Sequence, residues 1–231
     1  MAGGPSAVAG REPGRPDRVR AYDGRVLLAI DTSAGTSVAV VDPSTRRVLA
    51  ERETEDTRRH AEVIGPFLDE TLRAAGITPA EVTAVVAGMG PGPFTGLRVG
   101  IAAARTFAAA RDVPFLPLVS HDAVAAGQHG PLVVLTDARR REVAWSAYDA
   151  DGVRVAGPGL ARPADLDDVL RASRPDLVDW PRHTAVTIPA GRLGVLAADR
   201  LASGTPLAAD TPVYLREPDV TVPGAPKRVA R

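Results

Sequence analysis

Two short stretches carry residue types and spacings that could bind an anion. The first is AIDTSAGTSVAVVD, residues 29–42, in which an apolar run ends in Asp31 and a turn with Thr32 and Ser33 follows. Such a β-turn-β can present hydroxyls and backbone N–H groups to a phosphate, while the aspartate orients a metal ion or a water. The alternative is an ordinary hairpin with polar turn residues, and the pattern alone favours that alternative.

The second stretch is GMGPGPFTGLRVG, residues 88–100, where a loop rich in glycine and proline runs into a predicted helix. The N–H groups at a helix N-terminus carry partial positive charge, so Gly90, Gly92 and Gly96 with Thr95 could form an anion nest. The stretch lacks both the Gly-Lys-Thr of a P-loop and the glycine spacing of a dinucleotide-binding turn. The other interpretation is a loop that turns the chain and orients the following helix.

The helix that follows this loop has an unusual stripe. Its members are spaced at i, i+4, i+7 and i+11, and they are Arg98, Ala102, Arg105 and Ala109. Small residues flanked by arginines suit close packing against another helix, with the arginines pairing to carboxylates. A solvent-facing stripe of good helix formers explains the pattern equally well.

Residues for catalysis are scarce. The four histidines are His60, His121, His129 and His183. None has a second histidine or a carboxylate at a spacing typical of a metal site, and Ile64 stands four residues after His60. The chain has no cysteine and no Gly-x-Ser-x-Gly elbow. We therefore expect neither a metal centre nor an activated nucleophile.

Hydrophobic periodicity predicts the elements that position these residues. In the first half we expect strands at 25–31, 37–42, 47–54, 82–88 and 115–118, and helices at 59–75, from 95 or 96 to 110, and at 120–126. In the second half we expect strands at 131–137 and 142–148 and helices at 163–172 and 189–202. The segment 176–189 has no clear pattern. Helices that separate the later strands indicate mixed sheets with helices on their faces.

Several residues are expected to mark helix ends. Asp56 or Thr57 is the predicted N-cap of the first helix, and Gly76 is its predicted C-cap. Pro66 should kink this helix or mark a late start. Ser120 is the predicted N-cap of the third helix.

Composition limits the classes of function. The 231 residues are 45% hydrophobic, which is enough for one large domain or two small lobes, and the 28 basic and 28 acidic residues cancel. A neutral chain is not one that holds nucleic acid mainly by its own charge. No apolar run is long enough for a membrane span, and residues 1–24 do not resemble a signal peptide. We expect a cytoplasmic protein that makes no contact with a membrane.

The motifs in their order closely resemble those of the TsaB family, also called YeaZ. They are AIDTSAGTSVAVVD, His60-Ala61-Glu62 with Pro66, GPGPFTGLRVGIAAARTFA, VSHDAVA, DARRREV and a final Tyr214-Leu215-Arg216. The Gly-Pro-Gly-x-Phe-Thr-Gly-Leu-Arg segment is highly specific, whereas the other pieces are weak individually. The resemblance covers residues 26–216.

The resemblance implies an α/β fold with two lobes, of the actin, sugar-kinase and Hsp70 type (ASKHA), in which helices surround mixed sheets. The two lobes are expected at 25–118 and at 119–216. Residues 1–24, in which glycine, proline and arginine predominate, are expected to be a disordered extension, and residues 217–231 a flexible tail. The family's Gly-Asp-Gly turn is not recognisable between Asp176 and Pro189, so the second lobe is expected to be reduced.

The resemblance also implies a function. The chain is expected to be a non-catalytic subunit that binds and activates the threonylcarbamoyltransferase TsaD. That enzyme forms N6-threonylcarbamoyladenosine at position 37 of tRNAs reading codons that begin with A. The implied partners are TsaD as a heterodimer, the ATPase TsaE through the TsaB–TsaD complex, tRNA indirectly, and a second copy of the chain when TsaD is absent. No cofactor of its own is expected, except ATP or ADP at the partner interface.

Two sets of site residues follow. The partner interface is expected on the first two helices, at His60, Ile64, Phe67, Arg98, Ala102, Arg105 and Ala109. Anion or nucleotide contact is expected, as a secondary role, at Asp31, Thr32, Ser33, Gly90, Gly92, Thr95 and Gly96. Pro93 stands where the family usually has serine, which removes a hydroxyl and an N–H group from the nest. We therefore favour the interpretation in which the loop turns the chain and orients the following helix.

Two other functions stay open at this point. One is a small ATP-binding or ATP-hydrolysing enzyme of the same superfamily, in which Asp31, Ser33 and the loop at 90–96 would hold phosphates. The other is a homodimeric binding module with a different partner.

Overall fold

The computed structural model describes residues 26–138 and 140–216. The expectations for the extension at 1–24 and for the tail at 217–231 lie outside these residues. Within the described part, no helix has the length and apolar character that a membrane crossing requires.

The first sheet has five strands. They are β1 (Leu27–Asp31), β2 (Thr36–Asp42), β3 (Arg47–Thr54), β4 (Ala84–Gly88) and β5 (Phe115–Leu118), in the order β3-β2-β1-β4-β5. The β1–β2 and β2–β3 pairs are antiparallel, whereas β1–β4 and β4–β5 are parallel. Every residue of β1 and β4 is buried, because helices cover both faces of the sheet at these strands.

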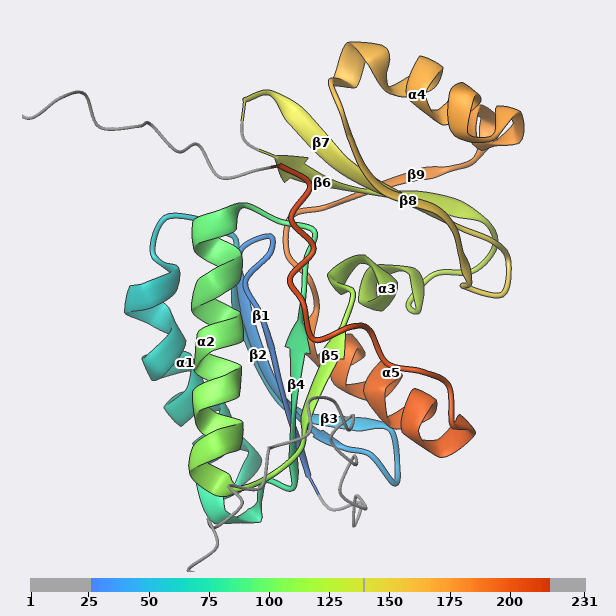
Figure 1. Ribbon diagram of the computed structural model, residues 1–231. Coiled ribbons are helices and arrows are strands. Elements are labelled where there is room, and N and C mark those ends of the chain that lie inside the picture. The colour runs from blue at the N-terminus through green and yellow to red at the C-terminus, as the bar shows by residue number, and fades with distance from the viewer. Residues whose placement is uncertain (1–25, 139, 217–231) are drawn as a thin grey trace, which may run out of the picture.

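Two layers of helices enclose this sheet (Figure 1). Helices α1 (His60–Ala75) and α2 (Phe94–Arg111) pack side by side on one face, over β2 and β3 and over β1 and β4. The opposite face packs against α5 (Ala190–Ser203), with the short α3 (Ser120–Ala125) beside it. Because β1, β4 and β5 run parallel to one another, their carboxyl ends meet at one edge of the sheet, close to the start of α2 and of α3.

The second sheet repeats the order of the first four strands. Its strands are β6 (Leu132–Ala138), β7 (Glu142–Tyr148), β8 (Arg154–Ala161) and β9 (Arg182–Ala185), in the order β8-β7-β6-β9. Helix α4 (Leu166–Ser173), between 3₁₀ turns at Pro163–Asp165 and Pro175–Asp179, covers one face. The expected two-lobed α/β fold, with a smaller second sheet, is confirmed.

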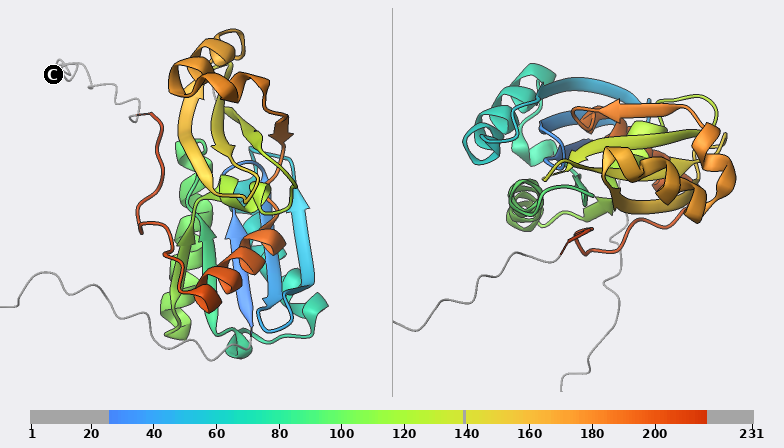
Figure 2. Two further views of the ribbon diagram at one scale, coloured as in Figure 1. Left: turned by 90° about the vertical axis from the view of Figure 1, so that its right-hand side faces the viewer. Right: turned by 90° about the horizontal axis from the view of Figure 1, so that it is seen from above.

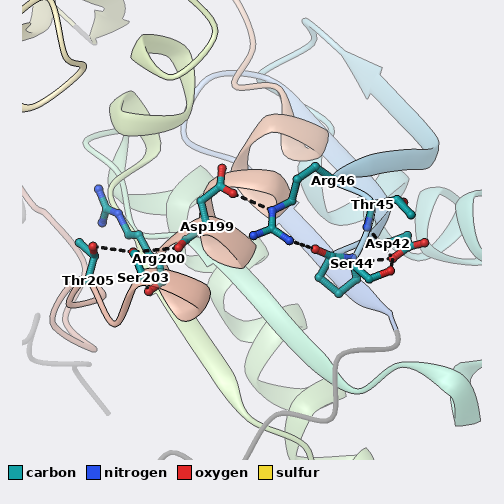
Figure 3. Close-up of polar contacts among 9 residues, drawn as sticks. Asp42, Ser44, Thr45, Arg46, Asp199, Arg200, Ser203 and Thr205 are labelled. Carbon is teal, nitrogen blue, oxygen red and sulfur yellow. Dashed lines mark hydrogen bonds and ion pairs between the residues drawn. The ribbon is translucent and has the colours of Figure 1, made fainter.

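Helix α5 follows the second sheet in the chain but packs on the first. Ala190, Leu193 and Ala197 join the core cluster that contains Leu27 and Val41. The turn between β2 and β3 also reaches α5, because Arg46 Nε donates to Asp199 Oδ1 at 2.6 Å (Figure 3). Asp42 holds the same turn by accepting bonds from the N–H and hydroxyl groups of Ser44.

The chain after α5 forms a C-terminal strap, residues 205–216, along the side of both lobes (Figure 2). Ala208 N donates to Pro117 O at 3.0 Å and Val213 N donates to Met89 O at 2.7 Å, so the strap follows β5 and then the end of β4. Its last described residue, Arg216, pairs with Glu142 on β7. The strap therefore connects the first sheet to the second.

Two local expectations are wrong and two strands were missed, for identifiable reasons. Helix α1 begins after Arg59 without a side-chain cap, and Asp56 accepts a bond from Arg58 N instead. Ser120 lies inside the first turn of α3, and its hydroxyl bonds to Asp31 rather than to the helix. Strand β8 was not predicted, because RVAGPGLA contains two glycines and a proline. Strand β9 lies inside the segment that had no clear pattern.

Candidate functional site

The turn after β1 packs against the glycines of the second motif. A Cβ on Gly88 would lie 1.6 Å from Asp31 Oδ2, and one on Gly92 would lie 2.7 Å from Ser33 Cα. On α2, a Cβ at Gly100 would lie 2.3 Å from Thr32 Oγ1. Contacts this short exclude any side chain at these positions. The glycines therefore make room for residues 31–33 of the chain itself, which fits a loop that turns the chain and orients α2.

Thr32 is inserted into the hydrogen-bond ladder of α2. Its hydroxyl donates to Gly96 O at 2.7 Å and accepts from Gly100 N at 2.9 Å. In a regular helix the N–H group of Gly100 would bond directly to the carbonyl of Gly96, since the two residues are four apart. The threonine hydroxyl thus bridges the ladder and holds the first turns of α2 against the end of β1.

Asp31 is the centre of a buried hydrogen-bond network. Its Oδ1 accepts from the N–H and hydroxyl groups of Ser33 at 2.7 and 2.6 Å, and its Oδ2 accepts from the Ser120 hydroxyl. Ser120 in turn accepts from Gly90 N at 3.0 Å. Burial raises the pKa of Asp31 to about 6, and the bonds from Ser120 and Ser33 offset part of that effect.

The two residues after Ser120 bond to the second lobe. His121 lies between Ser146 Oγ and Thr136 Oγ1, each at 2.9 Å, and burial together with Arg154 lowers its pKa to about 3. Asp122 accepts from Tyr148 at 2.7 Å and from Arg200 at 2.8 Å. These roles were missed from the sequence, where the only signal is three polar residues directly after an apolar strand.

A cleft of about 570 Å³ opens between the two lobes. Its lining comes from the first turns of α1 and α2, the turn after β1, the segment between β3 and α1, and the ends of β6 and β9. Of the predicted anion contacts, Ser33, Thr95 and Gly96 line this cleft. The other four are not among the lining residues: Asp31, Thr32, Gly90 and Gly92.

His60 faces inward rather than toward an outer surface. The residue is 7% exposed, and its Nδ1 lies 2.7 Å from Thr36 Oγ1. Burial lowers the pKa of its imidazole, and the carboxylate of Asp56 offsets part of that effect. Its assignment to a partner interface does not fit this burial, because the ring lines the cleft. Ile64 and Phe67 are half-buried against the core under α1.

The predicted stripe on α2 is solvent-exposed along its whole length, at Arg98, Ala102, Arg105 and Ala109. The strap engages both of its arginines. Arg98 Nε donates to the Tyr214 hydroxyl at 3.0 Å, and Arg105 pairs with Asp210 at 2.6 Å. The sequence pattern predicted that the arginines would pair with carboxylates of a partner. For Arg105, Asp210 of the same chain supplies such a carboxylate.

The donor sets do not favour a metal centre. Within residues 26–138 and 140–216, no group of three or more His, Cys, Asp or Glu side chains is arranged to hold a metal ion. Asp31, one of the candidate carboxylates for orienting a metal ion or a water, is fully enclosed by its hydrogen-bond donors.

We expect Gly100→Ala to destabilise the protein by about 2 kcal/mol or more, because the new methyl group overlaps the Thr32 hydroxyl. The matched control is Gly65→Ala on α1, where a Cβ meets nothing within 4 Å. That change should stabilise the protein by up to about 1 kcal/mol through helix propensity. Urea unfolding measures both, and equal effects in the two variants would contradict the packing described here.

We expect Asp31 to make stability fall as pH rises from about 4 to 6. The folded protein binds the Asp31 proton more tightly than the unfolded chain does, since the pKa rises from 3.8 to about 6 on folding. At about 1.4 kcal/mol per pKa unit, the loss is about 3 kcal/mol and is complete above pH 6.

The Asp31→Asn variant isolates this effect. The difference in unfolding free energy, wild type minus variant, should decrease between pH 4 and pH 6 and then stay constant. His121 has the opposite pH dependence, but it is present in both proteins and cancels in the difference. A difference that does not change with pH would show that Asp31 is ionised at the same pH in both states.

Comparison with known proteins agrees with the fold and the motifs. Residues 47–213 match the family described as "TsaD: tRNA N6-adenosine threonylcarbamoyltransferase". An uncharacterised protein of Mycobacterium tuberculosis is 38% identical over 205 residues, which cover 84% of this chain and 92% of that protein. The tRNA N6-adenosine threonylcarbamoyltransferase of Streptococcus sanguinis is 33% identical over 201 residues, covering 68% of this chain and 59% of the transferase.

Two solved structures from Pseudomonas aeruginosa are also similar. One is a protein described as similar to peptidase YeaZ, with a TM-score of 0.66 and 26% identity over 83% of this chain and 100% of its own. The other is YeaZ itself, with a TM-score of 0.63 at the same identity and coverage. The chain therefore belongs to the TsaD family of tRNA threonylcarbamoyladenosine biosynthesis and, within it, to the YeaZ, or TsaB, group.

Proposed function

We propose that the chain is a non-catalytic subunit that binds and activates a TsaD-type threonylcarbamoyltransferase through the outer face of α1 and α2. The observation that carries this proposal is the stripe on α2. It is exposed at every position, and α1 packs beside it on the same face of the sheet. Two adjacent helices with an uncovered face are suited to form a helix bundle with two helices of a partner.

The side chains of the stripe support close helix packing. Ala102 and Ala109 are exposed and small, so a partner helix can approach the backbone of α2 at these positions. Arg98 and Arg105 lie on either side of Ala102. The guanidinium of Arg98 is held by the Phe94 and Tyr214 rings, and that of Arg105 is held by Asp210. Arginines that are already ordered lose less conformational entropy when they pair with a partner.

A non-catalytic role is supported by the donor sets in the described part of the chain. His60 has Ile64 one turn later, and its Nδ1 is bonded to Thr36. A lone imidazole cannot supply the three protein ligands typical of a catalytic metal. Asp31 holds the fold together and does not line the cleft, so it is poorly placed to activate a nucleophile.

The remaining parts of the proposal follow from the family. We place the activity in N6-threonylcarbamoyladenosine formation at position 37 of tRNAs reading codons that begin with A. TsaE would act through the complex of this chain with TsaD, and the tRNA would be bound indirectly. The same outer face would form a homodimer when TsaD is absent, and ATP or ADP would bind at the partner interface.

We expect Ala102→Glu to abolish co-purification with TsaD, because a charged side chain would be buried between packed helices. Ala172→Glu is the matched control, since it makes the same change at an exposed alanine of α4 in the second lobe. The two proteins are co-expressed, and complex formation and tRNA modification are measured. A complex of native affinity with Ala102→Glu would disprove docking through this face.

The ATP-handling alternative is separated by calorimetry on the isolated chain. Because Asp31 is enclosed by hydrogen-bond donors, we expect no turnover of ATP with Mg²⁺, and no change in heat when Asp31 is replaced by asparagine. Tight binding with turnover that disappears in Asp31→Asn would favour the enzyme instead.

A further inference from the structure

The N-terminus of α2 opens into the cleft between the lobes. Pro93 is its N-cap and offers no side-chain acceptor, and the first N–H group with a helical partner is that of Leu97, which bonds to Pro93 O at 2.9 Å. The N–H groups of Thr95 and Gly96 have no acceptor among the described residues, and both residues line the cleft. An uncapped start of an 18-residue helix favours negative charge.

A second and independent feature is the edge of the His60 ring. His60 is more than nine-tenths buried, and its Nε2 has no hydrogen-bond partner within the described residues. This atom lies beside the first turn of α2, because a Cβ on Gly96 would be 2.7 Å from it. The ring is buried, but Nε2 itself is accessible from the cleft, so it is free to bond to a ligand or a water there.

The hydrogen-bond pattern identifies this nitrogen as a donor. The Thr36 hydroxyl is fully buried, and His60 Nδ1 is its one partner among the described residues. A buried hydroxyl needs an acceptor for its proton, so Thr36 donates to Nδ1. In a neutral imidazole the other nitrogen then carries the hydrogen. Nε2–H and the N–H groups of Thr95 and Gly96 are therefore donors that line one cleft.

The charged side chains of the cleft restrict the ligand. Arg58 contributes a positive charge, whereas Glu55 and Asp137 contribute negative ones. These three side chains sum to one negative charge, so they repel a polyphosphate more strongly than a small oxyanion, whose binding would depend on the N–H donors. The hydroxyls of Thr57 and Thr95 add further polar groups to the lining.

We propose that a small oxyanion, either a carboxylate or a phosphoryl group, binds in this cleft against His60 Nε2 and the first turn of α2. The site shares Thr95 and Gly96 with the set predicted from the sequence, but it adds His60 and does not use Asp31 or Gly90. It also goes beyond the proposed function, since docking on the outer face of α1 and α2 does not require it.

The test is nuclear magnetic resonance on the full chain labelled with ¹⁵N. Sodium phosphate and sodium acetate are titrated separately, with sodium chloride at matched ionic strength as the control. We expect saturable shifts of the Thr95 and Gly96 amides and of the His60 Nε2 resonance with at least one of the two oxyanions. Phosphate alone would identify a phosphoryl group, and acetate alone a carboxylate.

Variants then connect the shifts to the proposed donors. His60→Ala should weaken binding of the active oxyanion at least tenfold, whereas His129→Ala, at an exposed histidine outside the cleft, should leave it unchanged. The wild-type titration does not depend on the folding of either variant. Shifts that match those of chloride, shifts confined to surface arginines, or undiminished binding by a folded His60→Ala protein would each overturn the proposal.

Discussion

The fold depends on three consecutive polar side chains at the start of α3. Ser120 donates to Asp31 at the end of β1, and His121 bonds to β6 and β7 of the second sheet. Asp122 accepts hydrogen bonds from Tyr148 and Arg200. All three residues are buried, so each bond replaces water that the folded chain excludes. Because the side chains point to different elements, one turn of helix sets the position of both sheets and of α5.

Helix α2 is the element that connects the two proposed surfaces. Its exposed stripe faces outward, its first turn faces the cleft, and Thr32 holds the helix to β1 by entering its hydrogen-bond ladder. The four glycines at 88, 92, 96 and 100 allow this close approach. Helix α2 therefore contributes residues to both proposed surfaces.

Much of the architecture could be predicted, because apolar periodicity reflects burial directly. Strands β3 and β7 were predicted to the residue, and the helical stripe was assigned to positions that are exposed. The site was harder to predict, since the same glycines suit a ligand or a neighbouring segment. Only the packing of residues 31–33 decides between them. The inward direction of His60 depends on its long-range bond to Thr36, which no local pattern shows.

The late position of α5 has a consequence for biosynthesis. Residues 27–118 contain all five strands of the first sheet, but the helix that covers its second face is at Ala190–Ser203. While the ribosome is still translating the second sheet, the buried side chains of Leu27 and Val41 lack the cover that Leu193 later provides. The first lobe therefore reaches its native packing only after α5 has been synthesised, and until then one apolar face of its sheet is uncovered.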